Sequence, residues 1–257
     1  MSIICLYDNS GIMAKPWVKG GVNASCYDIK NKYSQERFDS GAHLNMVNFD
    51  ISGETLERCA RAINRISKGQ KIYYRNTYRG TVTQFMPIDV RPTPVRLVFA
   101  FVPCTDLAVS GAAHFKAKRE RDADFQQKAV QRALDAIQFA KDLGAEYCIE
   151  NPVSMLSTLW RKPDYTFHPY EYGGYLNADE AEHPLYPDHI APRDAYSKKT
   201  CLWTSEGFRM PEKKPVACES FGNSRQHSKL GGRSEKTKTI RSLTPRGFAK
   251  AVYLANR

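Results

Sequence analysis

The feature that most limits how this chain can fold is an uninterrupted apolar run that ends at a proline and a cysteine. Residues 97–102, LVFAFV, contain no polar side chain, which indicates a buried central strand of a parallel sheet. Pro103 and Cys104 follow at once, and Thr105 and Asp106 begin a polar loop. In open α/β sheets, ligands and reactive side chains collect at the carboxyl ends of the strands. Most cysteines are buried and inert, but this position makes Cys104 a candidate nucleophile.

The composition is that of a folded globular protein with an unusual charge. The chain has 257 residues, enough for one α/β domain with insertions. Its 38 Lys and Arg against 27 Asp and Glu give a net charge of +11, which favours a polyanionic partner, nucleic acid first. No segment approaches the roughly 20 apolar residues of a membrane span, and the N-terminus lacks the features of a signal peptide. We therefore expect a cytoplasmic protein that does not bind a membrane.

The cysteines and histidines do not predict a metal site. The seven cysteines are scattered without CxxC spacing, and several lie in apolar runs, which argues against a zinc site and against a disulfide framework. His168, His183 and His189 have acidic neighbours but fit no tight ligand pattern. We expect reduced thiols and no metal.

Strand-like and helix-like patterns alternate along the chain. Besides the central run, apolar runs predict strands at 3–7, 24–27, 44–49, 146–149 and 200–204. Helical spacing predicts helices over 12–21, 54–66 and 125–144, and over a final segment that begins at Thr244-Pro245 and turns Phe248, Ala251, Val252 and Leu254 inward. This alternation predicts an α/β fold, a doubly wound and mostly parallel sheet in a single domain over 1–257.

Polar residues follow several of the predicted strands. Asp8, Ser10 and Gly11 follow the first strand in a Gly-containing turn, as at the opening of a nucleotide-binding βα unit. Asp28 ends the second strand, where such folds hold ribose hydroxyls, and Asp50 ends the third. An isolated acidic residue of this kind is more often a solvated loop residue. Together, however, these five predict a cofactor pocket.

A carboxylate follows the strand after the central one. Glu150 comes directly after the run 146–149 and precedes Asn151 and Pro152. Because parallel strands end at the same edge of a sheet, the Glu150 carboxylate and the Cys104 thiol are predicted to lie at one edge.

Three segments interrupt the alternation. Residues 68–96 interleave Tyr with Arg, which suits either base stacking and phosphate contact or a β-ribbon with a packed Tyr face. Residues 161–196 are rich in aromatic residues and proline, and residues 205–241 hold much of the basic excess in a Gly/Ser/Pro-rich context that predicts loop rather than helix. We expect these insertions to form the nucleic-acid-facing side of the molecule.

Taken together, the motifs resemble those of DNA cytosine C5-methyltransferases. The resemblance rests on the order Pro103-Cys104, Glu150-Asn151, the pair Lys198-Lys199 before a strand, and a terminal Thr-Pro helix. It is closest to the compact methyltransferase-like proteins of bacteriophages and prophages, in which PCTxLAVSG, IENP and KKTxLW occur together, and it covers the catalytic core from end to end. It implies a Rossmann-like fold that binds S-adenosylmethionine and methylates carbon 5 of a flipped-out cytosine in DNA. We expect the protein to act as a monomer.

The resemblance also implies roles for individual residues. Cys104 would add to carbon 6 of the cytosine, Glu150 would protonate or hydrogen-bond N3, and Lys199, at the family's Arg position, would reach O2. The residues implied for the cofactor are Asp8, Ser10, Gly11, Asp28, Asp50, Pro103 and Thr244. The residues implied for the nucleic acid are Ser110, Lys198, Arg225, Lys229, Arg233 and Lys236.

Several positions depart from the family pattern. The Gly-rich first motif is reduced to Ser10-Gly11, Thr105 replaces a Gln, and ENP replaces ENV. The space between Thr204 and the final helix is too short for a full target-recognition domain. We therefore expect relaxed or short-site recognition of duplex or single-stranded DNA, and RNA stays open as a substrate. A catalytically silent DNA-binding or antirestriction protein on the same fold is the alternative from another class.

One departure bears on the methyl donor. Where the family has a Gly-Asn pair before the final helix, this chain has Arg241-Ser242. A guanidinium beside a cationic sulfonium is unfavourable unless an anion lies between them. The donor's own carboxylate is one such anion. The additional carboxylate of carboxy-S-adenosylmethionine is another, and a carboxymethyl group would then be transferred.

Overall fold

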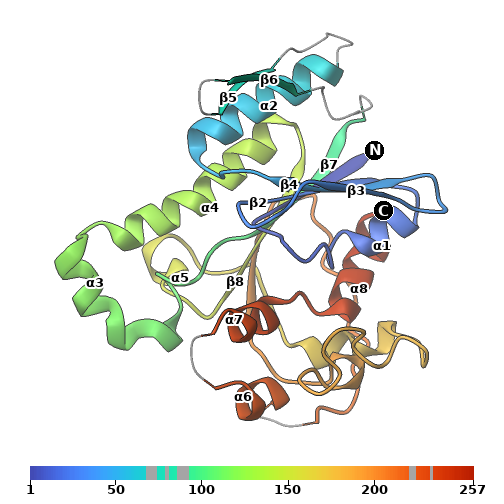
Figure 1. Ribbon diagram of the computed structural model, residues 1–257. Coiled ribbons are helices and arrows are strands. Elements are labelled where there is room, and N and C mark those ends of the chain that lie inside the picture. Colours follow the sequence, from blue (N-terminus) through green and yellow to red (C-terminus); the bar gives the residue numbers. More distant parts are fainter. Residues whose placement is uncertain (68–73, 79–80, 86–92, 220–223, 232–233) are drawn as a thin grey trace.

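An eight-stranded sheet forms the centre of the protein (Figure 1). The computed structural model describes residues 1–67, 74–78, 81–85, 93–219, 224–231 and 234–257. In chain order the strands of this sheet are β1 (Ser2–Leu6), β2 (Asn23–Asp28), β3 (Ser34–Arg37), β4 (His43–Asn48), β7 (Val95–Phe101), β8 (Glu146–Pro152), β9 (Tyr165–Phe167) and β10 (Thr200–Thr204). Their spatial order is β3-β4-β2-β1-β7-β8-β10-β9.

The five central strands, β4-β2-β1-β7-β8, are all parallel, and the edge strands β3, β10 and β9 pair antiparallel. This confirms the prediction of a mostly parallel α/β sheet. The strand order reverses between β1 and β7. The chain that leaves β1 therefore continues toward β2, and the chain that leaves β7 continues toward β8, on opposite sides of one crevice. Such a switch point is where open α/β sheets bind ligands.

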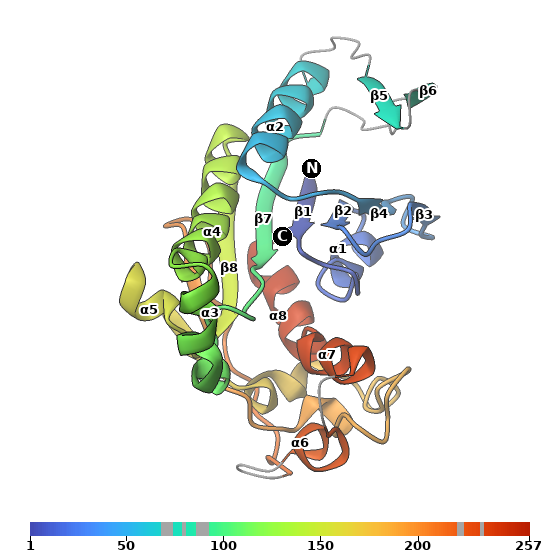
Figure 2. The ribbon, with the colours of Figure 1, turned by 60° about the vertical axis from the view of Figure 1, so that its left-hand side comes forward.

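Helices cover both faces of the sheet (Figure 2). The face toward the final helix carries α1 (Lys15–Lys19) and α8 (Arg246–Asn256), and the other carries α2 (Gly53–Ser67) and α4 (Phe125–Asp142). The remaining helices are α3 (Phe115–Arg121), α5 (Leu156–Leu159), α6 (Arg225–Lys229) and α7 (Glu235–Ser242). Among the residues that the structure describes, no helix combines the length and the apolar content needed to cross a membrane.

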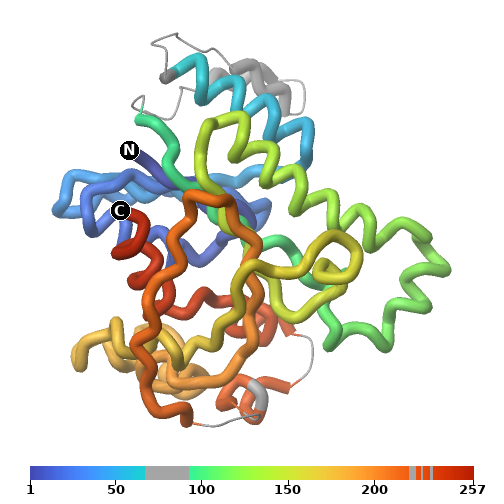
Figure 3. Tube along the Cα trace, turned by 180° about the vertical axis from the view of Figure 1, so that it is seen from behind, coloured from blue at the N-terminus to red at the C-terminus, as the bar shows by residue number. Residues whose placement is uncertain are grey.

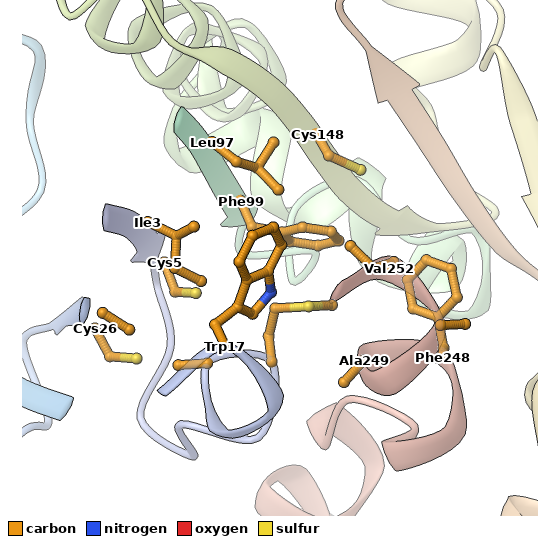
Figure 4. Close-up of a cluster of buried hydrophobic side chains, with 14 of the residues drawn as sticks. Ile3, Cys5, Trp17, Cys26, Leu97, Phe99, Cys148, Phe248, Ala249 and Val252 are labelled. Atoms are coloured by element: carbon orange, nitrogen blue, oxygen red, sulfur yellow. The ribbon is translucent and has the colours of Figure 1, made fainter. Parts of the chain in front are cut away.

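Aromatic packing fixes α8 on the sheet (Figure 4). The Phe248 ring is 1% exposed and stacks on Phe167 with ring centroids 4.0 Å apart, and Trp17 of α1 meets Tyr253 edge-on at 5.4 Å. Burying a phenylalanine stabilises a fold by about 1.5–3 kcal/mol. The prediction that Leu254 faces inward is wrong, since its side chain is 40% exposed. It lies two residues, about 200° of helix, from the buried Val252.

On the other face, α4 presents a stripe of alanines to the sheet. Ala129, Ala133, Ala136 and Ala140 have no exposed surface, and they recur at the helical spacing predicted from the sequence. Small side chains allow the helix backbone to approach β7 and β8 closely. The rigid contact between α4 and the strands supports the carboxyl ends that carry the candidate site.

Two sequence predictions about helices need correction. The helix predicted over 12–21 is only the five residues of α1, because Gly11 has a φ of +64° and the chain before Lys15 forms a turn. The segment 205–241, predicted as loop, contains α6 and α7. The Ser234 side chain accepts a hydrogen bond from the Thr237 amide, an N-cap inside the Ser- and Gly-rich stretch, and Ile240 packs into a separate apolar cluster.

The insertion 68–96 is described at residues 74–78, 81–85 and 93–96. These residues include an antiparallel pair, β5 (Tyr74–Tyr78) and β6 (Thr81–Phe85), which agrees with the predicted ribbon and does not distinguish between its two predicted roles. This pair lies at the end of the molecule opposite α6 and α7 (Figures 1 and 2). The chain must return to the amino edge of the sheet before parallel strand β7 can begin, so an insertion directly before β7 emerges at that edge.

The other two insertions lie together at the carboxyl end of the central strands. After β10 the chain runs back along the sheet beside the segment 161–196 (Figure 3). The Gly174 amide donates to the Lys214 carbonyl at 2.8 Å, and the Val216 amide donates to the Tyr170 carbonyl at 2.9 Å. These contacts build a lobe around the N-terminal end of α8, next to the candidate site.

Candidate functional site

Cys104 lies in a tight turn that follows β7. The amides of Leu107 and Ala108 donate to the Cys104 carbonyl at 3.0 and 2.7 Å. Lys118 of α3 holds the same turn from outside, because its Nζ donates to the Thr105 carbonyl at 2.8 Å and to Asp106 Oδ1 at 2.7 Å. The thiol is therefore half-buried on a loop whose backbone is hydrogen-bonded from both sides.

Asn151 joins the ends of β7 and β8. Its side chain is fully buried, and its Nδ2 donates to the Val102 carbonyl at 2.8 Å, directly before Pro103. The Met155 amide also donates to the Leu107 carbonyl at 2.8 Å. These bonds fix the Cys104 turn relative to the neighbouring Glu150. The motif ENP contains this residue, but the sequence gives no sign that its amide is the link.

The structure brings Cys104 and Glu150 within electrostatic reach of each other and of Lys198. Burial raises the pKa of the Cys104 thiol, the Glu150 carboxylate raises it further, and the Lys198 ammonium lowers it. Burial also raises the pKa of Glu150, and Lys198 again acts in the opposite direction. The carboxyl group is therefore suited to holding a proton, and Lys198 is the cation that favours the thiolate.

A cavity of about 10 Å³ lies beside Glu150, between the sheet and the N-terminal end of α8. Its lining residues are Phe101, Glu150, Phe167, Lys198, Thr200, Ser242, Leu243, Thr244, Pro245 and Phe248. This volume holds about one water molecule. The Lys198 Nζ donates to the Arg241 carbonyl at 2.8 Å and so joins the two walls. In this conformation the cavity is too small to hold a nucleobase.

The structure places Lys198, and not the predicted Lys199, at the cavity. Lys198 and Thr200 line the cavity with Glu150, while Lys199 is exposed and its charge acts on Cys201. Successive residues of an extended segment point to opposite faces, so a displacement of one residue exchanges the two faces of the sheet. Lys198 thus takes the position expected of its neighbour.

The turn after β1 is built around a buried carboxylate. Asp8 is 4% exposed, and its Oδ1 accepts hydrogen bonds from the Ser10 amide (2.7 Å), the Ser10 hydroxyl (2.8 Å) and the Gly11 amide (2.9 Å). Asp8 therefore shapes the predicted cofactor turn from inside instead of facing a ligand. A turn whose amides already bind a carboxylate offers no cradle for a phosphate.

Asp28 is the last residue of β2, and Asp50 lies two residues beyond the end of β4, as predicted. Burial raises the pKa of Tyr7, Arg132 lowers it, and the carboxylates of Asp135, Asp50 and Asp28 raise it further. An open depression of about 370 Å³ lies nearby, lined by Asn9, Lys30, Asn31, Lys32, Ser34, Met46 and Thr239. Neither Asp28 nor Asp50 is among those lining residues. Sequence reasoning missed Asn31, whose Nδ2 donates to the carbonyls of Asp8 and Cys26.

The N-terminal end of α8 is held by a buried ion pair that the sequence did not predict. Asp194 is 1% exposed, and its Oδ2 accepts from the amides of Arg246 (2.6 Å) and Gly247 (3.2 Å). The Arg246 guanidinium donates to three carbonyls of residues 180–182 and lies 3.5 Å from Asp194 Oδ1. This pair places the buried Thr244 and Pro245 on the cavity wall.

The predicted nucleic-acid contacts differ in their surroundings. Arg225 is bound to Glu219 Oε1 (2.7 Å) and to the Pro187 carbonyl (3.2 Å), whereas Lys229, Lys236 and Ser110 are exposed. Arg233 lies outside the described residues. Pro103 is partly buried at the start of the Cys104 turn.

The guanidinium predicted to select the donor has another partner. Arg241 Nη2 donates to the Leu230 carbonyl at 2.8 Å, and it is Ser242 that lines the cavity. The geometry therefore lends no support to a donor with an additional carboxylate.

Within the described part of the chain, Cys5, Asp8 and Cys26 place possible metal-ligand atoms within 4.8 Å of one another. The Cys26 thiol donates to Asp8 Oδ2 at 3.7 Å, and Asp8 Oδ1 is bound by the turn. The cluster is thus accounted for as a hydrogen-bonded part of the core.

Comparison with models of known protein families finds none that matches this chain, and comparison with curated proteins finds no match. The side chains themselves define the chemistry of the site. A thiol, a carboxyl group of raised pKa and an ammonium lie within electrostatic reach of one another at the carboxyl edge of the sheet. This set suits nucleophilic addition to an electron-poor ring whose heteroatoms are protonated or hydrogen-bonded during the addition.

Proposed function

We propose that this protein is a DNA (cytosine-5-)-methyltransferase that acts as a monomer in the cytoplasm, on duplex or single-stranded DNA. One observation carries the proposal: Cys104, Glu150 and Lys198, from three different segments, are within electrostatic reach of one another at the carboxyl edge of the sheet. The motif pair PCTDLAVSG and IENPVS, which led to this expectation from the sequence, supplies two of these three groups.

The residues would divide the chemistry as follows. The Cys104 thiolate adds to carbon 6 of the cytosine, and the ring then becomes enamine-like and nucleophilic at carbon 5. The Glu150 carboxyl group donates a proton or a hydrogen bond to N3, which absorbs the charge that develops in the ring. Lys198 donates to O2. Once carbon 5 carries the new group, its hydrogen leaves as a proton and the electron pair expels the Cys104 thiolate.

The cofactor implied is S-adenosylmethionine, which supplies an electrophilic methyl group when bound. The turn at Asp8 fits such a ligand better than a nucleotide with a pyrophosphate, because the Ser10 and Gly11 amides are already bound to the Asp8 carboxylate. Asp28, Asp50 and Thr244 would hold the cofactor from the ends of β2 and β4 and from the wall of the cavity.

DNA would approach the carboxyl edge, where the insertions 161–196 and 205–241 lie. Lys229 and Lys236 are exposed there and would contact phosphates. The target base must leave its stack to reach Cys104, because carbon 6 of a stacked base is closed to a thiol.

Nucleoside mass spectrometry and adduct trapping test this proposal. The protein is incubated with S-adenosylmethionine and cytosine-containing DNA, and in parallel with DNA carrying 5-fluorocytosine, whose fluorine cannot leave as a cation. We expect 5-methylcytosine in the first reaction and a covalent adduct on the Cys104 peptide in the second. Cys104→Ala should abolish both, and Cys218→Ala, at another half-buried cysteine, should abolish neither. DNA binding without methylation or adduct would instead identify a silent DNA-binding protein.

A further inference from the structure

The helix α3 carries charge that the proposed function leaves unused. Lys116, Lys118, Arg119 and Arg121 against Glu120 leave a net charge of +3 on its seven residues (4 − 1). The helix buries none of its side chains, although most helices in proteins are stabilised by an apolar face packed on the core. It projects from the body beyond the N-terminal end of α4 (Figures 1 and 2). Core packing therefore does not explain why these residues form a helix at this place.

Two contacts hold α3 beside the Cys104 turn. Lys118 Nζ bonds the Thr105 carbonyl and Asp106 Oδ1 at 2.8 and 2.7 Å, so the helix is anchored to the two residues that follow the thiol. The Phe115 ring packs on Phe125 of α4 with centroids 5.8 Å apart. These anchors use Lys118, and Lys116, Arg119 and Arg121 remain exposed on the helix.

The exposed cations of α3 are only weakly engaged with the protein. Arg119 Nη2 lies 3.4 Å from Gln126 Oε1, a long bond to a neutral amide that a phosphate could replace at little cost. A second cation near Cys104 is Lys198, whose charge acts on both the thiol and Glu150. Cations from two separate parts of the chain thus lie near Cys104, and a nucleic-acid strand carries a phosphate on each side of every nucleotide.

We propose that α3 is a phosphate-binding arm that holds the nucleic-acid backbone next to the nucleotide at Cys104. Lys116, Arg119 and Arg121 supply the contacts, and Lys118 ties the arm to the Cys104 turn. The identity of that nucleotide rests on the proposed function, but the arm itself requires only that the chain binds a polynucleotide at this edge.

The salt dependence of binding tests the arm. Fluorescence anisotropy with a labelled cytosine-containing duplex, over roughly 50–200 mM salt, gives the slope of log K against log salt. One variant combines Lys116→Gln, Arg119→Gln and Arg121→Gln. The matched control combines Arg58→Gln, Arg61→Gln and Lys141→Gln, three exposed cations on α2 and at the C-terminal end of α4. Circular dichroism checks that both variants are folded.

Each lost phosphate contact reduces the magnitude of the slope by about 0.9. We therefore expect the slope of the α3 variant to be smaller in magnitude than the wild-type slope by about two to three, and the control to keep the wild-type slope. The oligonucleotide should also slow alkylation of Cys104 in the wild type and protect it less in the α3 variant. Equal slopes for the two variants would refute the proposal that α3 binds phosphates, and would leave the proposed function intact if methylation persists. A wild-type protein that binds no nucleic acid would overturn both.

Discussion

Replacing Asp194 should destabilise the whole fold, because this residue holds the start of α8 from 52 positions away in the chain. Its carboxylate accepts from two backbone amides and pairs with Arg246, and the side chains of the pair are 2% and 15% exposed. Asp194→Ala leaves both amides without their acceptor and the Arg246 guanidinium without its carboxylate partner. Removing one partner of a buried ion pair costs about 3–5 kcal/mol. The free energy of unfolding should fall by that amount.

Urea unfolding, followed by circular dichroism and extrapolated linearly to water, measures the change. Asp194→Asn keeps an acceptor that can cap the helix but removes the charge, so its cost should be smaller, about 1–3 kcal/mol. The control is Glu57→Ala, which removes an exposed i,i+4 pair with Arg61 and should cost at most about 0.5 kcal/mol. If Asp194→Ala costs no more than this control, the capping role is refuted.

Three further outcomes are expected. Burial raises the pKa of Glu150 in the folded protein. The contribution of this group to stability is therefore present below its unfolded pKa and is lost as pH rises through its folded pKa. In urea unfolding, Glu150→Gln should be more stable than wild type at pH 8 but not at pH 4. The pKa of Cys104 is also raised, so its alkylation by iodoacetamide, followed by peptide mass spectrometry, should be slow at pH 7. Glu150→Gln should shift the pH dependence of alkylation to lower pH, and Lys198→Gln should shift it to higher pH. Profiles that do not separate would contradict the assigned electrostatics. Lys198→Met should reduce methyl transfer by at least tenfold, the effect of about 1.4 kcal/mol, whereas Lys199→Met should stay near wild type; the reverse order in a methylation assay would restore Lys199.

Part of the site could be predicted because it depends on short-range patterns. The apolar run of β7 and the shorter run of β8 are legible as buried strands, and parallel strands end at one edge. Those two facts suffice to bring Cys104 and Glu150 together. The alanine stripe of α4 is predictable for a similar reason, since a period of 3.6 residues places it on one face.

The rest depends on contacts between segments far apart in the chain. Lys198 and Lys199 are chemically equivalent in sequence, and the pairing of β10 with β8 determines which one faces the cavity. Asp194 resembles any loop carboxylate until the lobe folds back and places it at the N-terminal end of α8. Asp8 is a candidate ligand in sequence, but in the structure the amides of its own turn surround it. The sequence by itself thus determined the central parallel strands, the helices α2, α4 and α8, and the edge at which the polar ends of those strands gather, because periodicity and strand direction are local properties. Only the tertiary structure decided which of those polar groups face the cavity and which are bound within the protein, because that depends on strand register and on hydrogen bonds across long loops.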